Sequence, residues 1–277
     1  MTATAALTSP VPAWRQYLWL LGAAWKAQLQ YRGDWLLVLI GGILYQGVGL
    51  AFVWIVVTRF GHVGGWGMGN LAFLYGLRLT AHALWTIPFN QLNYMDWAVQ
   101  RGDFDRWLIR PAGPLTQLLT NRTSFQPTGD LVGGIGVLAA ASTIAPVNWS
   151  PTPVLYLLAA IVGGALTECS LQLFFCGLCF RTLATRALRL NFIDNIMNNF
   201  GNYPFAIFPT ALRFGLTFAL PLAFVAYLPA AVLLHRSHEI SVAPWLAAAA
   251  PALGPILFTI AYKFWYSQLK HYKSTGT

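Results

Sequence analysis

The stretch "WLLVLIGGILYQGVGLAFVWIVV" (residues 35–57) contains no charged side chain. A helix of about 20 consecutive apolar residues is long enough to cross a hydrocarbon core about 30 Å thick. Runs of similar length and composition recur along the rest of the chain. A soluble fold would have to hide all of them in one core, and too few polar residues are present to cover it. The sequence therefore predicts an all-α integral membrane protein.

The composition of the whole chain agrees with this prediction. The chain is 57% hydrophobic and 9% charged, whereas soluble domains are near a quarter charged. Its mean hydropathy is +0.56. In such a chain the net charge of +9 mostly reflects the Lys and Arg that gather in cytoplasmic segments. We therefore expect a lipid bilayer as the surroundings and no nucleic-acid partner.

The positions of the basic residues predict six transmembrane spans with both termini in the cytoplasm. We place an amphipathic interfacial helix at residues 12–33, ahead of the first span. Residues 212–234 are interrupted by Pro221 and Pro229, so we expect them to form a re-entrant external hairpin. Counting this segment as a full span gives a seven-span alternative, which puts the basic C-terminal residues outside. The expected spans are residues 35–57, 71–89, 129–144, 154–180, 190–208 and 243–262.

One short loop between the second and third spans, residues 92–112, is much more polar than its surroundings. It includes "WAVQRGDFDRWLIRPAGPL" (residues 97–115), in which aromatic side chains alternate with Arg and Asp. We expect Gly102 to break a first helix, Asp103 to cap a second one, and Pro111 to end it. A solvated loop that only sets topology is the simpler alternative. Aromatic residues and Arg together favour a docking surface for a partner protein.

The same loop resembles a known family. The segment "RGDFDRWLIRP" (residues 101–111) is similar to the permeases of type-2 ATP-binding-cassette (ABC) exporters, in particular to a subgroup with a Gly-Asp/Glu-hydrophobic-Asp…Arg-Pro signature here. The segment "YPFAIFPTALRFGLTFALPLAFVAYLPA" (residues 203–230) resembles the same subgroup. The resemblance implies a permease dimer, with an identical or related second permease, on two ATPase subunits. It also implies that the loop is a cytoplasmic coupling helix.

The expected ATPase-coupling residues belong to this loop, and the nucleotide chemistry is expected elsewhere. The chain has no G-x-x-x-x-G-K-[ST] motif, so we expect ATP and Mg²⁺ to bind the partner ATPase and no enzyme activity or cofactor in this chain. The alternatives are an ion-coupled secondary transporter and an intramembrane enzyme, for which no inverted repeat and no catalytic constellation is found. The coupling candidates are Tyr94, Trp97, Arg101, Asp103, Phe104, Asp105, Arg106, Trp107 and Arg110.

Ionisable residues within apolar runs are the other candidates, because each is costly in a membrane. Arg78 and Glu168 are candidates to line the translocation path. The alternative is an internal ion pair between Arg78 and either Asp130 or Glu168. Asp130 and Asp194 are expected to lie toward the interface. His82 is expected to be a helix-packing residue, and no spacing of His, Cys, Asp or Glu predicts a metal site. The transported substrate stays open, because drugs, lipids and glycan-linked lipids all suit an apolar path.

Overall fold

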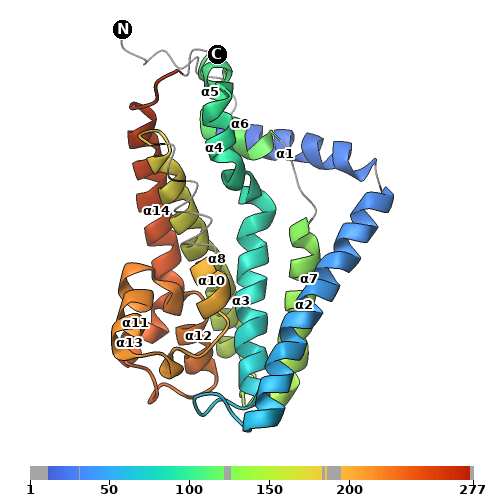
Figure 1. Ribbon diagram of the computed structural model, residues 1–277, viewed down its shortest axis with the longest axis vertical. Helices are drawn as coiled ribbons and strands as arrows, with labels where there is room; N and C mark the ends of the chain where they lie inside the picture. The colour runs from blue at the N-terminus through green and yellow to red at the C-terminus, as the bar shows by residue number, and fades with distance from the viewer. Residues whose placement is uncertain (1–11, 31, 122–125, 183–184, 186–194, 275–277) are drawn as a thin grey trace.

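The computed structural model describes residues 12–30, 32–121, 126–182, 185 and 195–274. Long helices run side by side along the longest axis of the molecule (Figure 1). One further helix, α1 (Ala13–Leu29), runs across this direction at one end, as an interfacial helix would. The long helices are α2 (Arg32–Phe60), α3 (Met68–Phe89), α7 (Gln126–Ile144), α8 (Pro151–Leu178) and α14 (Ala250–Leu269).

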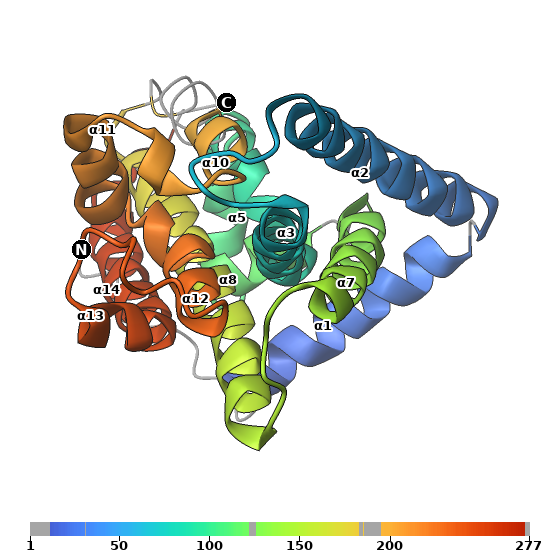
Figure 2. The ribbon, with the colours of Figure 1, turned by 90° about the horizontal axis from the view of Figure 1, so that it is seen from below.

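Helix α3 lies at the centre of the bundle. Figure 2 shows it between α7 and α2 on one side and α8 with the C-terminal helices on the other. Close approach to α7 depends on glycine, since a Cβ at Gly76 would lie 2.6 Å from the backbone nitrogen of Leu138. The pair α8 and α14 is equally close, where Gly163 and Gly254 face each other. Small residues at such crossings let helix backbones pack without the hydrophobic effect that soluble cores rely on.

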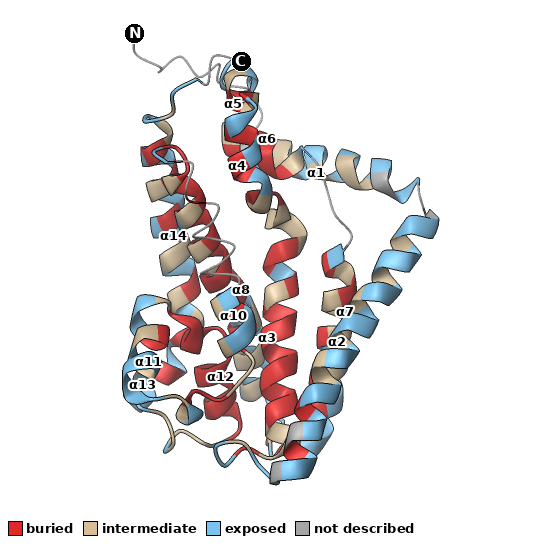
Figure 3. Cartoon of the chain, viewed as in Figure 1, coloured by how far each residue is buried: buried red, intermediate tan, exposed pale blue. Residues whose placement is uncertain are grey.

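Helix α2 is exposed along most of its length, in contrast to α3 (Figure 3). Only 6% of its most apolar window is buried within the chain. A helix that is apolar all round and unburied is a membrane span or faces another subunit. By length and composition, two helices among the described residues suffice to cross a membrane, residues 33–59 and 151–178. The number becomes three if the bent pair described below counts as one span.

Several short helices gather at one end of the bundle, which we call the α5 end. Here α3 continues into η1 (Asn90–Tyr94), α4 (Met95–Gln100), α5 (Asp103–Leu108) and α6 (Pro114–Thr120). The hydroxyl of Tyr17 in α1 donates to the carbonyl of Pro88 (3.0 Å), so α1 lies at the same end. The last residues of α14 and the segment after it also lie there (Figure 1).

The segment between α8 and α14 is the least regular part of the chain. It contains α10 (Asn195–Phe200), η3 (Phe205–Ile207), α11 (Thr210–Phe214), the π-helical turn η4 (Gly215–Ala219), η5 (Leu222–Phe224), α12 (Tyr227–Leu233) and α13 (Pro244–Ala248). The chain bends by 74° between residues 210–219 and 222–233. Proline at position 221 has no N–H to continue the helix, which explains the break there.

The helices differ from the expected spans mainly in this last third. Of the expected fifth span, residues 190–194 lie outside the described residues, and residues 195–208 form α10 and η3 rather than one helix. The proline at position 204 and the turn before it interrupt the helical hydrogen bonds. The last helix begins at Ala250, after α13, and continues to Leu269. It extends past the apolar run, and Trp265 in this extension is buried against Phe104 of α5.

Candidate functional site

A charged cluster lies inside the bundle, where α3 packs against α8. The side chain of Glu168 is fully buried. Its Oε1 lies 3.6 Å from Nε of Arg78, and its Oε2 lies 2.7 Å from Nδ1 of His82. The indole N–H of Trp85 donates to the same Oε2 at 2.8 Å. A buried carboxylate needs this many partners, because desolvation of a lone charge costs several kcal/mol.

The partner of Arg78, which the sequence leaves open, is Glu168. Asp130 lies elsewhere and accepts a hydrogen bond from Nε2 of Gln46 on α2 (2.7 Å). Arg78 also donates from Nη1 to Oδ1 of Asn202 (3.1 Å) and from Nη2 to Oδ1 of Asn198 (3.3 Å). Its guanidinium therefore joins α3 both to α8 and to the α10 segment. Asp194, the fourth acidic candidate, lies outside the described residues.

The polar loop after α3 folds into two short helices set against the bundle. Gly102 separates them with φ at +69°, a left-handed conformation that favours glycine. The expected cap is wrong in detail: Gly102 occupies the N-cap position, and Asp103 is the first helical residue. Asp103 instead pairs with Arg106 one turn later. Asp103 thus acts within the first turn of α5, where a negative charge also suits the helix dipole.

Two of the expected docking aromatics, Phe104 and Trp107, are buried inside this chain. Phe104 is 0% exposed, with ring centroids of Trp107 at 4.8 Å and of Phe180, just after the end of α8, at 5.2 Å. Trp265 of α14 also packs against it. The expectation that these two side chains are offered to a partner is therefore corrected. They hold the α5 end together, since the ends of α8 and α14 cover them.

The acidic side chains of the loop are also engaged within the chain. Asp96 is buried and accepts hydrogen bonds from Cys179 (3.1 Å) and Thr185 (3.3 Å). Asp105 accepts from the hydroxyl of Tyr272 (3.1 Å) and from Ser274 (2.8 Å). Burial, together with the hydrogen bond to Asp105, raises the pKa of Tyr272 to about 12. The tyrosine hydroxyl thus stays protonated and able to donate at neutral pH.

A buried glutamine that the sequence did not single out positions the loop. Nε2 of Gln117 in α6 donates to the carbonyl oxygens of Trp107 (2.8 Å) and Ala112 (2.6 Å). The carbonyl of Trp107 belongs to the last turn of α5, where helical partners run out, and that of Ala112 lies in the turn that follows. The sequence feature that could have indicated this role is a polar residue on the apolar face of the short helix at residues 114–120.

The outward surface of the loop retains most of the expected coupling residues. Tyr94 is 53% exposed and Trp97 is 40% exposed, with the guanidinium of Arg101 5.1 Å from the ring centroid of Trp97. Ile109, which was not a candidate, is 78% exposed. A pocket of about 300 Å³ opens beside Tyr94, Trp97 and Arg101, with Asp103 also at its edge. Arg106 and Arg110 are exposed as well.

The described residues offer little for metal or thiol chemistry. Among them, no group of three or more His, Cys, Asp or Glu side chains is placed to hold a metal ion. Cys169, Cys176 and Cys179 are buried free thiols. The sulfhydryl of Cys176 donates to the carbonyl of Leu92 (3.2 Å), which ties α8 to η1. These thiols therefore serve as packing residues.

Comparison with known proteins identifies the family. Neither a curated protein nor a solved structure is significantly similar to this chain. A family model described as "ABC-2 family transporter protein" matches residues 43–276. The match begins within α2 and includes the charged cluster, the polar loop and the bent segment. Such permeases are multi-pass membrane components that associate with an ABC ATPase and are generally not catalytic themselves. On this match, together with its apolar helices, the chain belongs to the ABC-2 family of transporter proteins.

Proposed function

We propose that this chain is the translocating permease subunit of an ATP-driven exporter and that its α4–α5 element docks on the ATPase. The α4–α5 element consists of η1, α4 and α5, residues 90–108. The main support for the proposal is that some side chains of this element are buried within the chain while others are exposed. Phe104 and Trp107 fasten the element to α8 and α14, while Tyr94, Trp97 and Arg101 stay on the surface around a pocket. The similarity of residues 101–111 to type-2 exporters supports the direction of transport.

An element with a buried face and an exposed face is suited to transmitting a movement of the ATPase to the transmembrane helices. A docking surface on a rigid, internally packed element transmits force without deforming, because packed interiors have low compressibility. Helix α3 continues directly into η1, and Arg78 and His82 lie on α3. A shift of the α4–α5 element would therefore move one side of the charged cluster relative to Glu168 on α8. ATP and Mg²⁺ act on the partner ATPase in this proposal.

The docking surface is tested with single substitutions of exposed residues. Trp97→Ala and Arg101→Ala should weaken capture of the ABC ATPase by the immobilised permease, by roughly 2 kcal/mol or more for a true anchor. Leu37→Ala, on the exposed face of α2, provides a control outside the element. Matched amounts of folded permease are compared, and the captured subunit is verified by its ATP hydrolysis. Undiminished capture by the Trp97→Ala/Arg101→Ala double variant would contradict the docking assignment.

We also propose six spans, cytoplasmic termini and a re-entrant external hairpin at residues 212–234 in the cytoplasmic membrane. Support comes from α1, the α4–α5 element and the end of α14, which all lie at the α5 end. The 74° bend supports the hairpin. In a variant without native cysteines, an impermeant thiol reagent should label Ser237→Cys from outside and Ser274→Cys only after the membrane is opened. Labelling of both from the same side would overturn the six-span topology.

The functional assembly in this proposal is a dimer of permeases, either identical or related chains. Helix α2 supports it, since its exposed apolar surface is available to a second permease as well as to lipid. Arg78 and Glu168 are proposed to border the path, joined as an ion pair in the conformation described here. Transport that follows an ion gradient and continues without any ATPase would favour a secondary transporter instead.

A further inference from the structure

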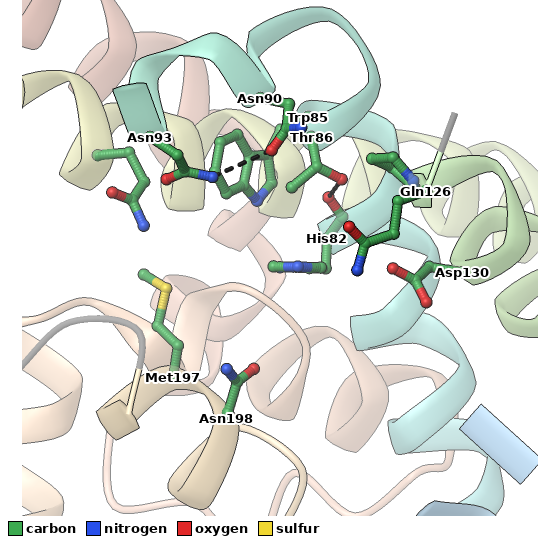
Figure 4. Close-up of a pocket in the computed structure, with 11 residues that line it drawn as sticks. His82, Trp85, Thr86, Asn90, Asn93, Gln126, Asp130, Met197 and Asn198 are labelled. Atoms are coloured by element: carbon green, nitrogen blue, oxygen red, sulfur yellow. Dashed lines mark hydrogen bonds between the residues drawn. The ribbon is translucent and has the colours of Figure 1, made fainter. Parts of the chain in front are cut away.

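A polar pocket of about 260 Å³ lies inside the bundle, beside the charged cluster (Figure 4). Side chains from α3, η1, α7, α8 and α10 surround it. The lining residues are His82, Trp85, Thr86, Asn90, Asn93, Gln126, Pro127, Asp130, Gln172, Met197 and Asn198. Drug-sized ligand sites are typically about 300–1,000 Å³. This pocket therefore suits the head group of a compound rather than a whole drug-sized molecule.

The lining is unusually rich in side-chain amides. Two asparagines come from η1, one glutamine comes from the start of α7, and further amides come from α8 and α10. Each amide group offers two donors and an acceptor with two lone pairs. A ligand with several hydroxyl groups, which also donate and accept, satisfies such a lining better than an apolar one or one that only accepts.

The charged residues of the pocket further restrict the kind of ligand that it can bind. Asp130 lines it, and none of the described lining residues is Lys or Arg. Asp130 accepts a hydrogen bond from Gln46, whose side chain is neutral. The charge of Glu168 is already balanced by Arg78. A cationic group is thus favoured in the pocket, and an anionic group such as phosphate is disfavoured.

Trp85 supplies an aromatic wall. Its N–H donates a hydrogen bond to Glu168, and its ring lies edge-on to that of His82 with centroids 5.6 Å apart. An aromatic ring attracts a nearby cation through its negative face and covers apolar C–H groups. The pocket thus combines amides, one carboxylate, the imidazole of His82 and an indole ring.

We propose that this pocket binds a hydroxylated amine, with an amino sugar as the simplest ring form, as the polar head of the transported compound. The inference extends the proposed transport function by naming a substrate class. Asn90 and Asn93 line the pocket, and Tyr94 in the same short helix η1 is exposed on the docking surface. Occupancy of the pocket is thereby linked to the element that meets the ATPase.

The test compares three sugars on the purified permease in lipid nanodiscs without any ATPase. Glucosamine, glucose and glucose 6-phosphate differ in charge on a common ring, and their binding is measured by saturation-transfer NMR and by tryptophan fluorescence. Glucosamine should bind about tenfold more tightly than glucose, as a charge-assisted hydrogen bond to Asp130 would give. Glucose 6-phosphate should bind most weakly.

Two variants assign the effect to the pocket. Asp130→Asn should abolish the preference for glucosamine over glucose, whereas Asp34→Asn on the exposed first turn of α2 should preserve it. Gln126→Ala, at the exposed start of α7, should weaken the binding of both glucosamine and glucose several-fold. This variant serves as the test if Asp130→Asn fails to fold.

Specific results would overturn the inference. They are tightest binding by glucose 6-phosphate, no binding of either glucosamine or glucose, or a glucosamine preference that survives in Asp130→Asn. Unchanged binding in Gln126→Ala would also place the site elsewhere. Since no ATPase is present, these failures leave the docking proposal standing, and a failed ATPase capture leaves this inference standing.

Discussion

Replacement of Phe104 by alanine should destabilise the permease itself rather than remove a contact with the ATPase. The side chain is fully buried, and the rings of Trp107, Phe180 and Trp265 surround it. Buried Phe→Ala substitutions cost about 3–5 kcal/mol, through lost transfer free energy and the cavity that remains. With aromatic neighbours from α5 itself, from the segment just after α8 and from α14, the site has little freedom to collapse, so we expect a value within this range.

The assay is equilibrium unfolding in mixed detergent micelles, titrated with SDS and followed by far-UV circular dichroism. Circular dichroism is preferred because nearby indole rings would alter the fluorescence of the variant. Ile109→Ala, at a position 78% exposed directly after the same element, should change the free energy of unfolding by no more than about 0.5 kcal/mol. Phe104→Leu retains much of the side-chain volume and should recover a large part of the lost stability.

One result would refute this reasoning. If Phe104→Ala unfolds at the same SDS fraction as the unsubstituted protein and yet captures less ATPase, then Phe104 contacts the partner and the packing described for the α5 end is incorrect. Reduced capture that tracks the fraction of folded permease would instead agree with a structural role.

Three further substitutions test other contacts. Glu168→Gln breaks a buried ion pair and should cost about 3–5 kcal/mol, measured as lost yield of folded permease; a normal yield with altered transport would show that the charge serves the path instead. Gly76→Leu should cost at least about 1–3 kcal/mol by forcing α3 away from α7, whereas Gly136→Leu, with nothing within 4 Å of its Cβ position, should be tolerated in the same unfolding assay. Tyr272→Phe should cost about 0.5–1.5 kcal/mol by removing the hydrogen bond to Asp105, with the ring contact to the α5 end retained.

Local composition was enough to predict the class of fold and several of its boundaries. A long run without charge, such as residues 35–57, has no stable place except a lipid bilayer or a fully enclosed core, so it predicts a membrane helix by itself. The break at Gly102 could also be predicted, because glycine tolerates the left-handed conformation found there. The resemblance of residues 101–111 to ABC exporter permeases agrees at the family level with the comparison.

The partners of side chains were decided by the tertiary structure. Phe104 and Trp107 lie among charged residues in the sequence, a pattern equally suited to a partner's groove and to the protein's own core. The ends of α8 and α14, more than seventy residues away along the chain, cover them. Arg78 likewise had two possible acidic partners. It pairs with Glu168 because α3 packs with α8 at that level, while Asp130 meets Gln46 where α7 packs on α2. Hydropathy and local propensity act within a segment, but an ion pair or an aromatic cluster depends on which helices become neighbours.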